Sequence, residues 1–295
     1  MSELASESSV LRTFRALLRE PAGLIGTVLI SLLVLCALVS LVWTPYDPTL
    51  VDPAAVWAPP FSGGRLLGTD GSGRDLFSQL LAGAQITTVA AVAATVVSGI
   101  VGIGLAVLAA VGRRSGEIVA RLIDVLVALP TLLLAMVLSA VYGGSVLTAV
   151  VAIGIGTGVN VARVGRAEMT SALGTDYVLA ARTSGASTAW IVRRHVLPNV
   201  APVLLVQLSL TLALAVLAEA ALSYLGFGTA PPTPSWGRML QDLQVYVTVH
   251  PWAVVWPGAA ITAAVLGFSL VGDALRDVTD PRLRRQAAAA PEVLA

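Results

Sequence analysis

Apolar runs of membrane-spanning length recur along the chain, and arginines lie between them. A helix of about 20 residues crosses the roughly 30 Å hydrocarbon core of a bilayer, at about 1.5 Å per residue. Only 12% of the residues are charged, whereas about a quarter are charged in an ordinary soluble domain. The sequence therefore predicts an all-α membrane protein with six transmembrane helices, over 24–43, 86–111, 118–142, 146–162, 200–225 and 252–271.

Arginine placement sets the predicted orientation of these helices. The chain has 18 arginines and no lysine. If the N-terminus is cytoplasmic, the outer segments hold only Arg65, Arg74 and Arg238, and the other 15 arginines lie on inner segments or at inner helix ends. This asymmetry fits the positive-inside rule. We therefore expect the N- and C-termini to be cytoplasmic.

The predicted organisation follows from this orientation. The first apolar run follows arginines as a signal peptide does, but it exceeds the usual core of about 7–15 residues and lacks a small-residue cleavage site. We interpret it as a retained helix. The expected segments are a cytoplasmic N-terminal segment (1–23), a first transmembrane helix (24–43), an extracytoplasmic loop (44–85), a core with five transmembrane helices (86–273) that includes a cytoplasmic loop (164–199) and an extracytoplasmic loop (226–251), and a cytoplasmic tail (274–295).

Between two of the apolar runs lies a polar segment, Asp176–Asn199. Asp176 and Ser187 are residue types that cap helix N-termini, and Gly185 suits the left-handed position that ends a helix. Pro198 either stops the second helix or begins the next apolar one. We expect two short helices with a bend at Gly185. Its small neighbours would let another protein approach; the alternative is an interfacial helix anchored by Trp190 and the arginines.

Small residues are dense in the apolar runs, and Gly154 and Gly158 have the GxxxG spacing. In lipid, small residues let helix backbones approach closely. Two interpretations stay open at this point. These glycines pack helices together within the subunit, or they form an interface with another subunit.

Three ionisable residues lie within or near the predicted helices. Glu219 is an intramembrane carboxylate, which indicates either a proton or cation site or a buried group bonded to a neighbouring helix. We favour the second interpretation. Arg121 and Asp124 are spaced i,i+3 and can pair on one helix face, which we interpret as local neutralisation rather than a gate.

Other polar residues give weaker signals. His195 and His250 have no His, Cys or carboxylate companions at ligand spacing, so we expect no metal site. Asp70, Arg74 and Asp75 lie in a Gly-rich outer segment. We interpret that segment as a solvated turn leading into a helix; the alternative is contact with an external protein. The sequence holds no nucleophile–base set for covalent catalysis.

Four segments resemble one family in the right order along the chain. Tyr177–Asn199 resembles the EAA loop of bacterial ABC-importer permeases, in which Ala180, Ala181, Gly185, Leu197 and Pro198 match the spacing and Leu179 replaces the Glu. Three further segments resemble signatures of dipeptide and oligopeptide permeases. The chain is thereby similar to the C-type permease subunit of dipeptide, oligopeptide and nickel ABC importers. The other three segments are Leu66–Thr87, Glu219–Leu240 and Gly272–Arg284.

The resemblance implies a type I ABC-importer permease fold and a function in ATP-driven peptide uptake across the bacterial inner membrane. It also implies that the loop docks in a groove of an ATPase and that ATP closure moves the helices. The expected partners are a second homologous permease, one or two ATPases, an extracytoplasmic substrate-binding protein and membrane lipid, with no nucleic acid. The residues expected to serve coupling are Ala180, Ala181, Arg182, Gly185, Ala186, Ser187, Trp190 and Pro198.

The absence of lysine bears on where ATP is hydrolysed. A P-loop needs a lysine that reaches the β- and γ-phosphates. This chain therefore cannot carry that motif, and we expect no cofactor in it, with ATP and Mg²⁺ bound by partner ATPases. A permease for nickel or another small solute is an alternative. An ion-coupled secondary transporter is a more distant one, because Glu219 alone offers little support for it.

Overall fold

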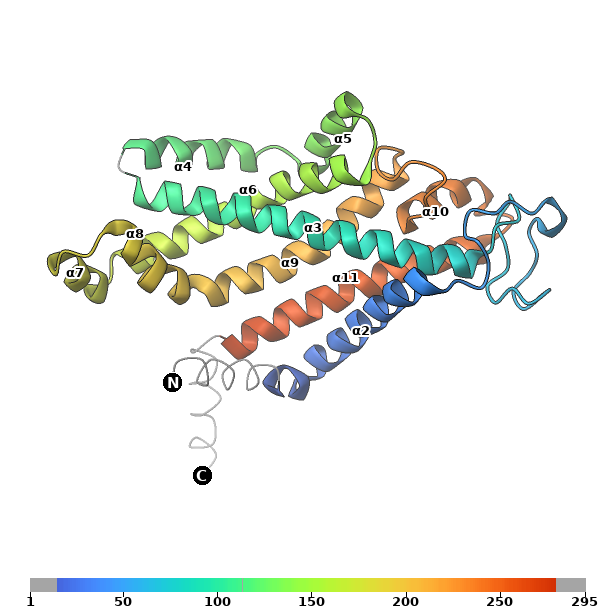
Figure 1. The fold of residues 1–295 in the computed structure, drawn as a ribbon, viewed down its shortest axis with the longest axis horizontal. Helices are drawn as coiled ribbons and strands as arrows, with labels where there is room; N and C mark the ends of the chain where they lie inside the picture. The colour runs from blue at the N-terminus through green and yellow to red at the C-terminus, as the bar shows by residue number, and fades with distance from the viewer. Residues whose placement is uncertain (1–14, 113, 280–295) are drawn as a thin grey trace.

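The computed structural model describes residues 15–112 and 114–279, which form a bundle of long helices (Figure 1). Five of its helical segments are long and apolar enough to cross a membrane. The longest single α-helix has 36 residues, or about 54 Å, so it extends well beyond the hydrocarbon core. The α-helices of these segments are α2 (Pro21–Val42), α3 (Leu76–Val111), α6 (Val146–Leu173), α9 (Leu197–Tyr224) and α11 (Pro251–Thr279).

The predicted third transmembrane helix is broken, which corrects the expectation of one helix over 118–142. It forms α4 (Arg114–Val127) and α5 (Thr131–Tyr142), which meet at 88°. Pro130 explains the break, because a proline disfavours the helical conformation of the residue before it. Pro130 itself has an extended ψ of 123°. The structure thus holds five such segments, or six if this bent pair counts as one span.

Glycines bring α3 and α6 into close contact along their length. A Cβ on Gly102 would lie 2.6 Å from the Gly158 carbonyl oxygen, and one on Gly154 would lie 2.9 Å from that of Ala94. No side chain fits at such distances. The GxxxG glycines therefore pack two helices of the same chain against each other, which is the interpretation of packing within the subunit.

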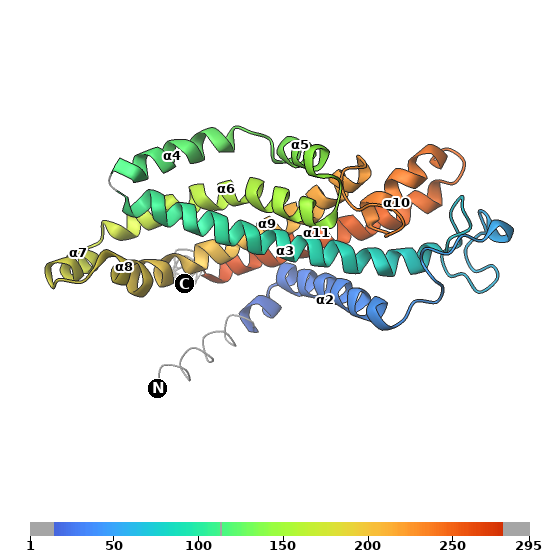
Figure 2. The ribbon, with the colours of Figure 1, turned by 45° about the horizontal axis from the view of Figure 1, so that its top comes forward.

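The first long helix, α2, packs against α11 and α3 (Figure 2). A Cβ on Gly26 would lie 2.9 Å from the Gly267 carbonyl oxygen, so the two backbones are in direct contact. This segment is therefore an integral part of the bundle, as expected for a retained helix. Residues 274–279 of the predicted tail form the end of α11, whereas the rest of the tail and most of the N-terminal segment lie outside the described residues.

Two apolar clusters divide the bundle along its length. One joins α3, α6 and α9 to α10 (Trp236–Leu243), a short helix between α9 and α11. The other joins α3, α6 and α9 to two short elements at the opposite end, α7 (Asp176–Thr183) and α8 (Thr188–Ile191). We call the end with α10 the outer end and the end with α7 and α8 the inner end (Figure 1).

Candidate functional site

The segment between α6 and α9 projects at the inner end of the bundle, past the ends of the neighbouring helices (Figures 1 and 2). We call residues 174–199 the inner loop. The helical segment that leaves it runs from Thr188 to Tyr224, a length of 37 residues, or about 55 Å. A bilayer measures about 40–45 Å including its head groups. The inner loop therefore lies at the end of a helical segment that is longer than a bilayer is thick.

Gly185 makes the turn between the two short helices. Its φ is +83°, in the left-handed region that costs other residues about 1–2 kcal/mol. The Ala186 amide bonds back to the Ala181 carbonyl oxygen at 3.0 Å, which satisfies a carbonyl at the end of α7. The Ser187 hydroxyl then accepts from the Trp190 amide at 3.3 Å. The predicted bend and the predicted cap at Ser187 are confirmed.

One detail of the inner loop differs from the prediction, and the structure decides between the two alternatives for Pro198. Thr175, not Asp176, holds the cap position of α7, and Asp176 lies in the first turn, where a negative charge suits the helix dipole. The second helix does not stop at Pro198. It continues through a π-helical turn, Val192–Val196, into α9, whose first turn holds Pro198. Pro198 therefore begins the next apolar helix, which is the second of the two alternatives.

An open hollow of about 530 Å³ lies at this turn. A Cβ on Gly185 would meet no atom of residues 15–112 and 114–279 within 4 Å. Trp190 is 50% exposed beside the hollow, and Leu179 is 60% exposed on α7. Such apolar exposure in a polar loop indicates a contact surface for another protein. The hollow is lined by Ala181, Ser184, Gly185, Ala186, Ser187 and Trp190.

The structure brings together most, but not all, of the predicted coupling residues. Arg182 and Ala180 are exposed on α7, close in sequence to the hollow, whereas Pro198 lies beyond the π-helical turn and does not line it. Ser184 lines the hollow and was not predicted. Small residues at a bend were the signal that could have found it.

Glu219 is buried at the contact of α9 with α3. Its carboxylate accepts from the Thr87 hydroxyl of α3 at 3.1 Å and from the Ser223 hydroxyl of α9 at 2.8 Å. Ser235, just before α10, also interacts with it. This is the hydrogen-bonded arrangement that we favoured over a proton or cation site.

Asp124 and Arg121 do not form the expected pair. The Asp124 carboxylate lies 3.8 Å from Arg166 of α6 instead, so the contact joins two helices rather than two turns of α4. The reason is that α6 lies directly beside α4 and presents a guanidinium to it. The contact is loose, and the side chains are 62% and 38% exposed.

Asp70, Arg74 and Asp75 do not form a solvated turn, which corrects that interpretation. Asp70 is 4% exposed and Asp75 is 1% exposed. Asp70 accepts from the Ser72 amide at 2.8 Å, the Arg74 amide at 3.0 Å and the Gln79 amide group at 3.1 Å. Asp75 caps α3 by accepting from the Ser78 amide.

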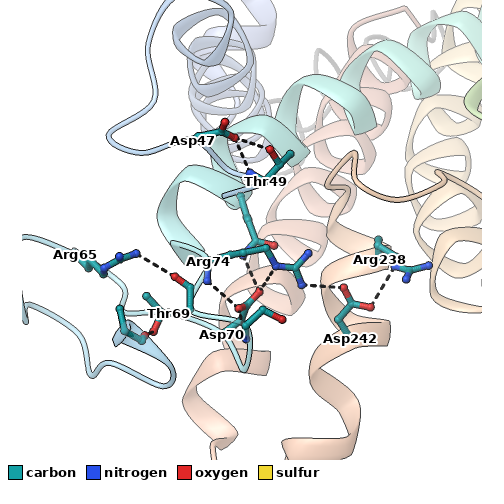
Figure 3. A network of polar contacts seen from close by, with 12 residues as sticks. Asp47, Thr49, Arg65, Thr69, Asp70, Arg74, Arg238 and Asp242 are labelled. Atoms are coloured by element: carbon teal, nitrogen blue, oxygen red, sulfur yellow. Dashed lines mark hydrogen bonds and ion pairs between the residues drawn. The ribbon is translucent and has the colours of Figure 1, made fainter. Parts of the chain in front are cut away.

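Arg74 extends this arrangement to α10 (Figure 3). Its guanidinium lies 2.8 Å from Asp70 and 3.3 Å from Asp242, which in turn lies 3.1 Å from Arg238. We call Asp70, Arg74, Arg238 and Asp242 the outer network. It joins two segments that are far apart in the sequence, so no local pattern could have predicted it.

The rest of the first outer loop is ordered by similar contacts. Arg65 pairs with Asp52 at 2.8 Å and lies over the Tyr46 ring, 4.8 Å from its centroid. The Thr49 hydroxyl and then the Thr49 amide donate to Asp47, and together they lower the pKa of that carboxyl. This loop therefore has a defined shape.

Apolar spans and close glycine packing between the long helices define a multi-span membrane protein. The family described as binding-protein-dependent transport system inner membrane component matches residues 98–285. The chain belongs to this family. It is therefore a permease subunit of an ABC transporter, a multi-pass protein of the bacterial inner membrane.

Named relatives are similar over nearly the whole chain. The di/tripeptide transport system permease protein DppC of Pseudomonas aeruginosa is 39% identical over 286 residues, covering 95% of this chain and 94% of that protein. The oligopeptide transport system permease protein OppC of Bacillus subtilis is 35% identical over 264 residues, covering 89% of this chain and 86% of that protein.

The fold is also similar to that of a solved transporter. A chain of the MetNI methionine ABC transporter, in an inward-facing conformation, aligns with a TM-score of 0.57 and 19% identity, covering 68% of this chain and 97% of that one. The protein therefore has the type I ABC-importer permease fold.

Proposed function

We propose that this chain is the permease subunit of an ATP-driven importer of dipeptides or oligopeptides. The observation that carries the proposal is the 39% identity to a di/tripeptide permease over 95% of this chain. The aligned region covers nearly the whole chain, so the similarity is not confined to one segment. A permease of this family for nickel or another small solute is the alternative.

The inner loop supports the proposed coupling to an ATPase. Its hollow is open, and Leu179 and Trp190 are exposed at the inner end of the bundle. The chain has no lysine, so ATP hydrolysis with a P-loop lysine takes place in a partner chain, which also binds Mg²⁺. Arg182 and Trp190 contact the ATPase, and Ala180, Ala181, Gly185, Ala186 and Ser187 let it approach.

The proposed assembly has further partners. A second, homologous permease completes the substrate path, one or two ATPases dock on the inner loops, and an extracytoplasmic binding protein delivers substrate. Closure of the ATPases moves the inner loop, and the bundle then alternates between outward-facing and inward-facing states by rigid-body motion.

Reconstitution tests this proposal. The chain is co-expressed with its genomic neighbours, purified through a tag on this chain, and placed in liposomes with the external binding protein. We expect an ATPase and a second permease to co-purify, and labelled dipeptide uptake to depend on ATP.

A control separates the rival mechanism. The purified chain alone is reconstituted and a proton gradient is imposed. Uptake by the chain alone without ATP would contradict the proposal and favour an ion-coupled transporter. Identification of a nickel chelate in the co-purified binding protein would leave the ATP-driven mechanism intact and replace peptide as the substrate.

A further inference from the structure

The helical segment from Thr188 to Tyr224 is weak near its inner end. Pro198 and Pro202 have no amide hydrogen, so the carbonyl groups of Arg194 and Pro198 lose their usual helical partners. The Val192–Val196 turn is π-helical, and the Leu197 amide bonds to the Val192 carbonyl oxygen five residues back. Prolines and π-helical turns are where helices bend. A push on α8 would bend this turn instead of moving α9.

Aromatic contacts lie across this weak turn. His195, on the π-helical turn itself, packs edge-on against Trp190, with ring centroids 5.0 Å apart. Its ring centroid is also 5.9 Å from that of Tyr177 in α7. The Asn199 side-chain amide donates to the Tyr177 hydroxyl at 3.2 Å. We call Tyr177, Trp190, His195 and Asn199 the brace.

The brace links points on both sides of the weak turn. Trp190 precedes the turn, Asn199 follows it, and Tyr177 contacts His195 and Asn199 from α7. Val178, Ile191 and Val196 are fully buried among apolar residues from the long helices. That packing holds the inner loop in place, and Tyr177 adds a ring contact from α7 to the turn and a hydrogen bond from α7 to Asn199.

We propose that the brace positions the inner loop relative to α9, so that a displacement of the loop moves α9 as a single rigid body. This rests on the proposed coupling of the inner loop to an ATPase. His195 is the central positioning residue, because its ring contacts the rings of both Tyr177 and Trp190. Its role is mechanical: it stiffens a turn that prolines have weakened.

The test measures substrate transported per ATP hydrolysed in the reconstituted importer. We expect His195→Ala and Tyr177→Leu to lower this ratio by about fivefold or more, at the lower end of typical coupling between sites. The ATPase should still co-purify, because the hollow is unchanged. Tyr142→Leu is the matched control, since Tyr142 is 75% exposed at the far end of α5, and it should leave the ratio unchanged.

Conservative and rescue variants separate the brace from general damage. Tyr177→Phe keeps the ring but removes the hydroxyl that Asn199 contacts, so its ratio should fall less than that of Tyr177→Leu. His195→Phe keeps an aromatic ring and should retain most of the coupling. Pro198→Ala added to His195→Ala supplies an amide hydrogen for the Arg194 carbonyl, so it should recover part of the lost ratio.

The outcomes distinguish this proposal from the proposed function. If no ATPase co-purifies with the unmodified chain, the coupling function fails. If the ATPase co-purifies and His195→Ala transports with an unchanged ratio, only the brace is overturned. A lower ratio in His195→Ala that Pro198→Ala and His195→Phe both fail to recover would also overturn it, because the loss would then not come from a weakened turn.

Discussion

The charged residues of the inner loop and those of the outer network lie in opposite environments. At the outer end Asp70 is almost completely buried, and donors from Ser72, Arg74 and Gln79 satisfy it. At the inner end Arg182, Arg193 and Arg194 are exposed, and none of them forms an ion pair within residues 15–112 and 114–279. Buried polar groups with hydrogen-bond partners hold the outer loop in one shape. Exposed arginines without ion pairs, in contrast, are available to a partner protein.

This contrast predicts that substitutions at the two ends fail in different assays. A change in the inner loop should affect transport and partner binding while the chain stays folded. A change in the outer network should first affect stability, because buried polar groups lose their partners. The predictions below test that division, beginning with the largest effect.

Gly185→Trp should abolish ATP-driven transport while membrane insertion stays normal. A Cβ at this position meets no atom of the described residues within 4 Å, but a partner docked at the turn would meet the indole. The φ of +83° adds strain of only about 1–2 kcal/mol. Uptake in proteoliposomes and co-purification of the ATPase measure the effect.

Gly185→Asn is the matched control for that strain. Asparagine tolerates the left-handed region and adds little bulk, so it should keep most of the transport activity. Transport by the tryptophan variant at the unmodified rate would show that the docking surface lies elsewhere on the inner end.

Asp70→Ala should destabilise the protein by about 3–5 kcal/mol, the usual loss when one partner of a buried ion pair is removed. Arg74 would keep its contact with Asp242 but lose the shorter one. Unfolding of the purified protein in detergent measures the change. Normal stability together with lost transport would place the outer network on the transport pathway. It would contradict the expectation that changes at the outer end act first on stability.

Some parts of this structure could be predicted from the sequence alone, and others could not. Runs of apolar residues predicted the long helices, and Gly185 and Ser187 predicted the bend of the inner loop, because these signals act within a few residues. Pro130 could have indicated the break in the predicted helix over 118–142, but a proline alone does not fix the angle of 88° between α4 and α5. The packing of α5 decides that angle.

Contacts between distant segments were the ones that could not be predicted. Asp124 has Arg121 three residues away, yet it pairs with Arg166 on another helix. Asp70 and Arg74 looked solvated because their Gly-rich surroundings are typical of turns, but α10 folds over them. Tyr177 and Asn199 are 22 residues apart, and only the fold brings them together.

Glu219→Ala should cost about 1–3 kcal/mol of stability, since the Thr87 and Ser223 hydroxyls would lose a buried acceptor. Glu219→Gln keeps an acceptor oxygen and nearly the same shape, so it should transport close to the unmodified rate. Detergent unfolding and ATP-driven uptake give the two measurements. Complete loss of uptake in the glutamine variant, with normal stability, would revive the proton-site interpretation.

Arg238→Ala should have the smallest effect, at most about 1 kcal/mol, as for other partly exposed ion pairs. Arg238 and Asp242 are 28% and 31% exposed, and Asp242 keeps Arg74 as a partner. Because salt screens exposed charges, the small loss should shrink further at high ionic strength. Unfolding of Arg238→Ala and Asp70→Ala at low and high salt measures this. A loss for Arg238→Ala as large as that for Asp70→Ala, and insensitive to salt, would mean that the four charges act as one unit rather than as a buried pair with an exposed extension.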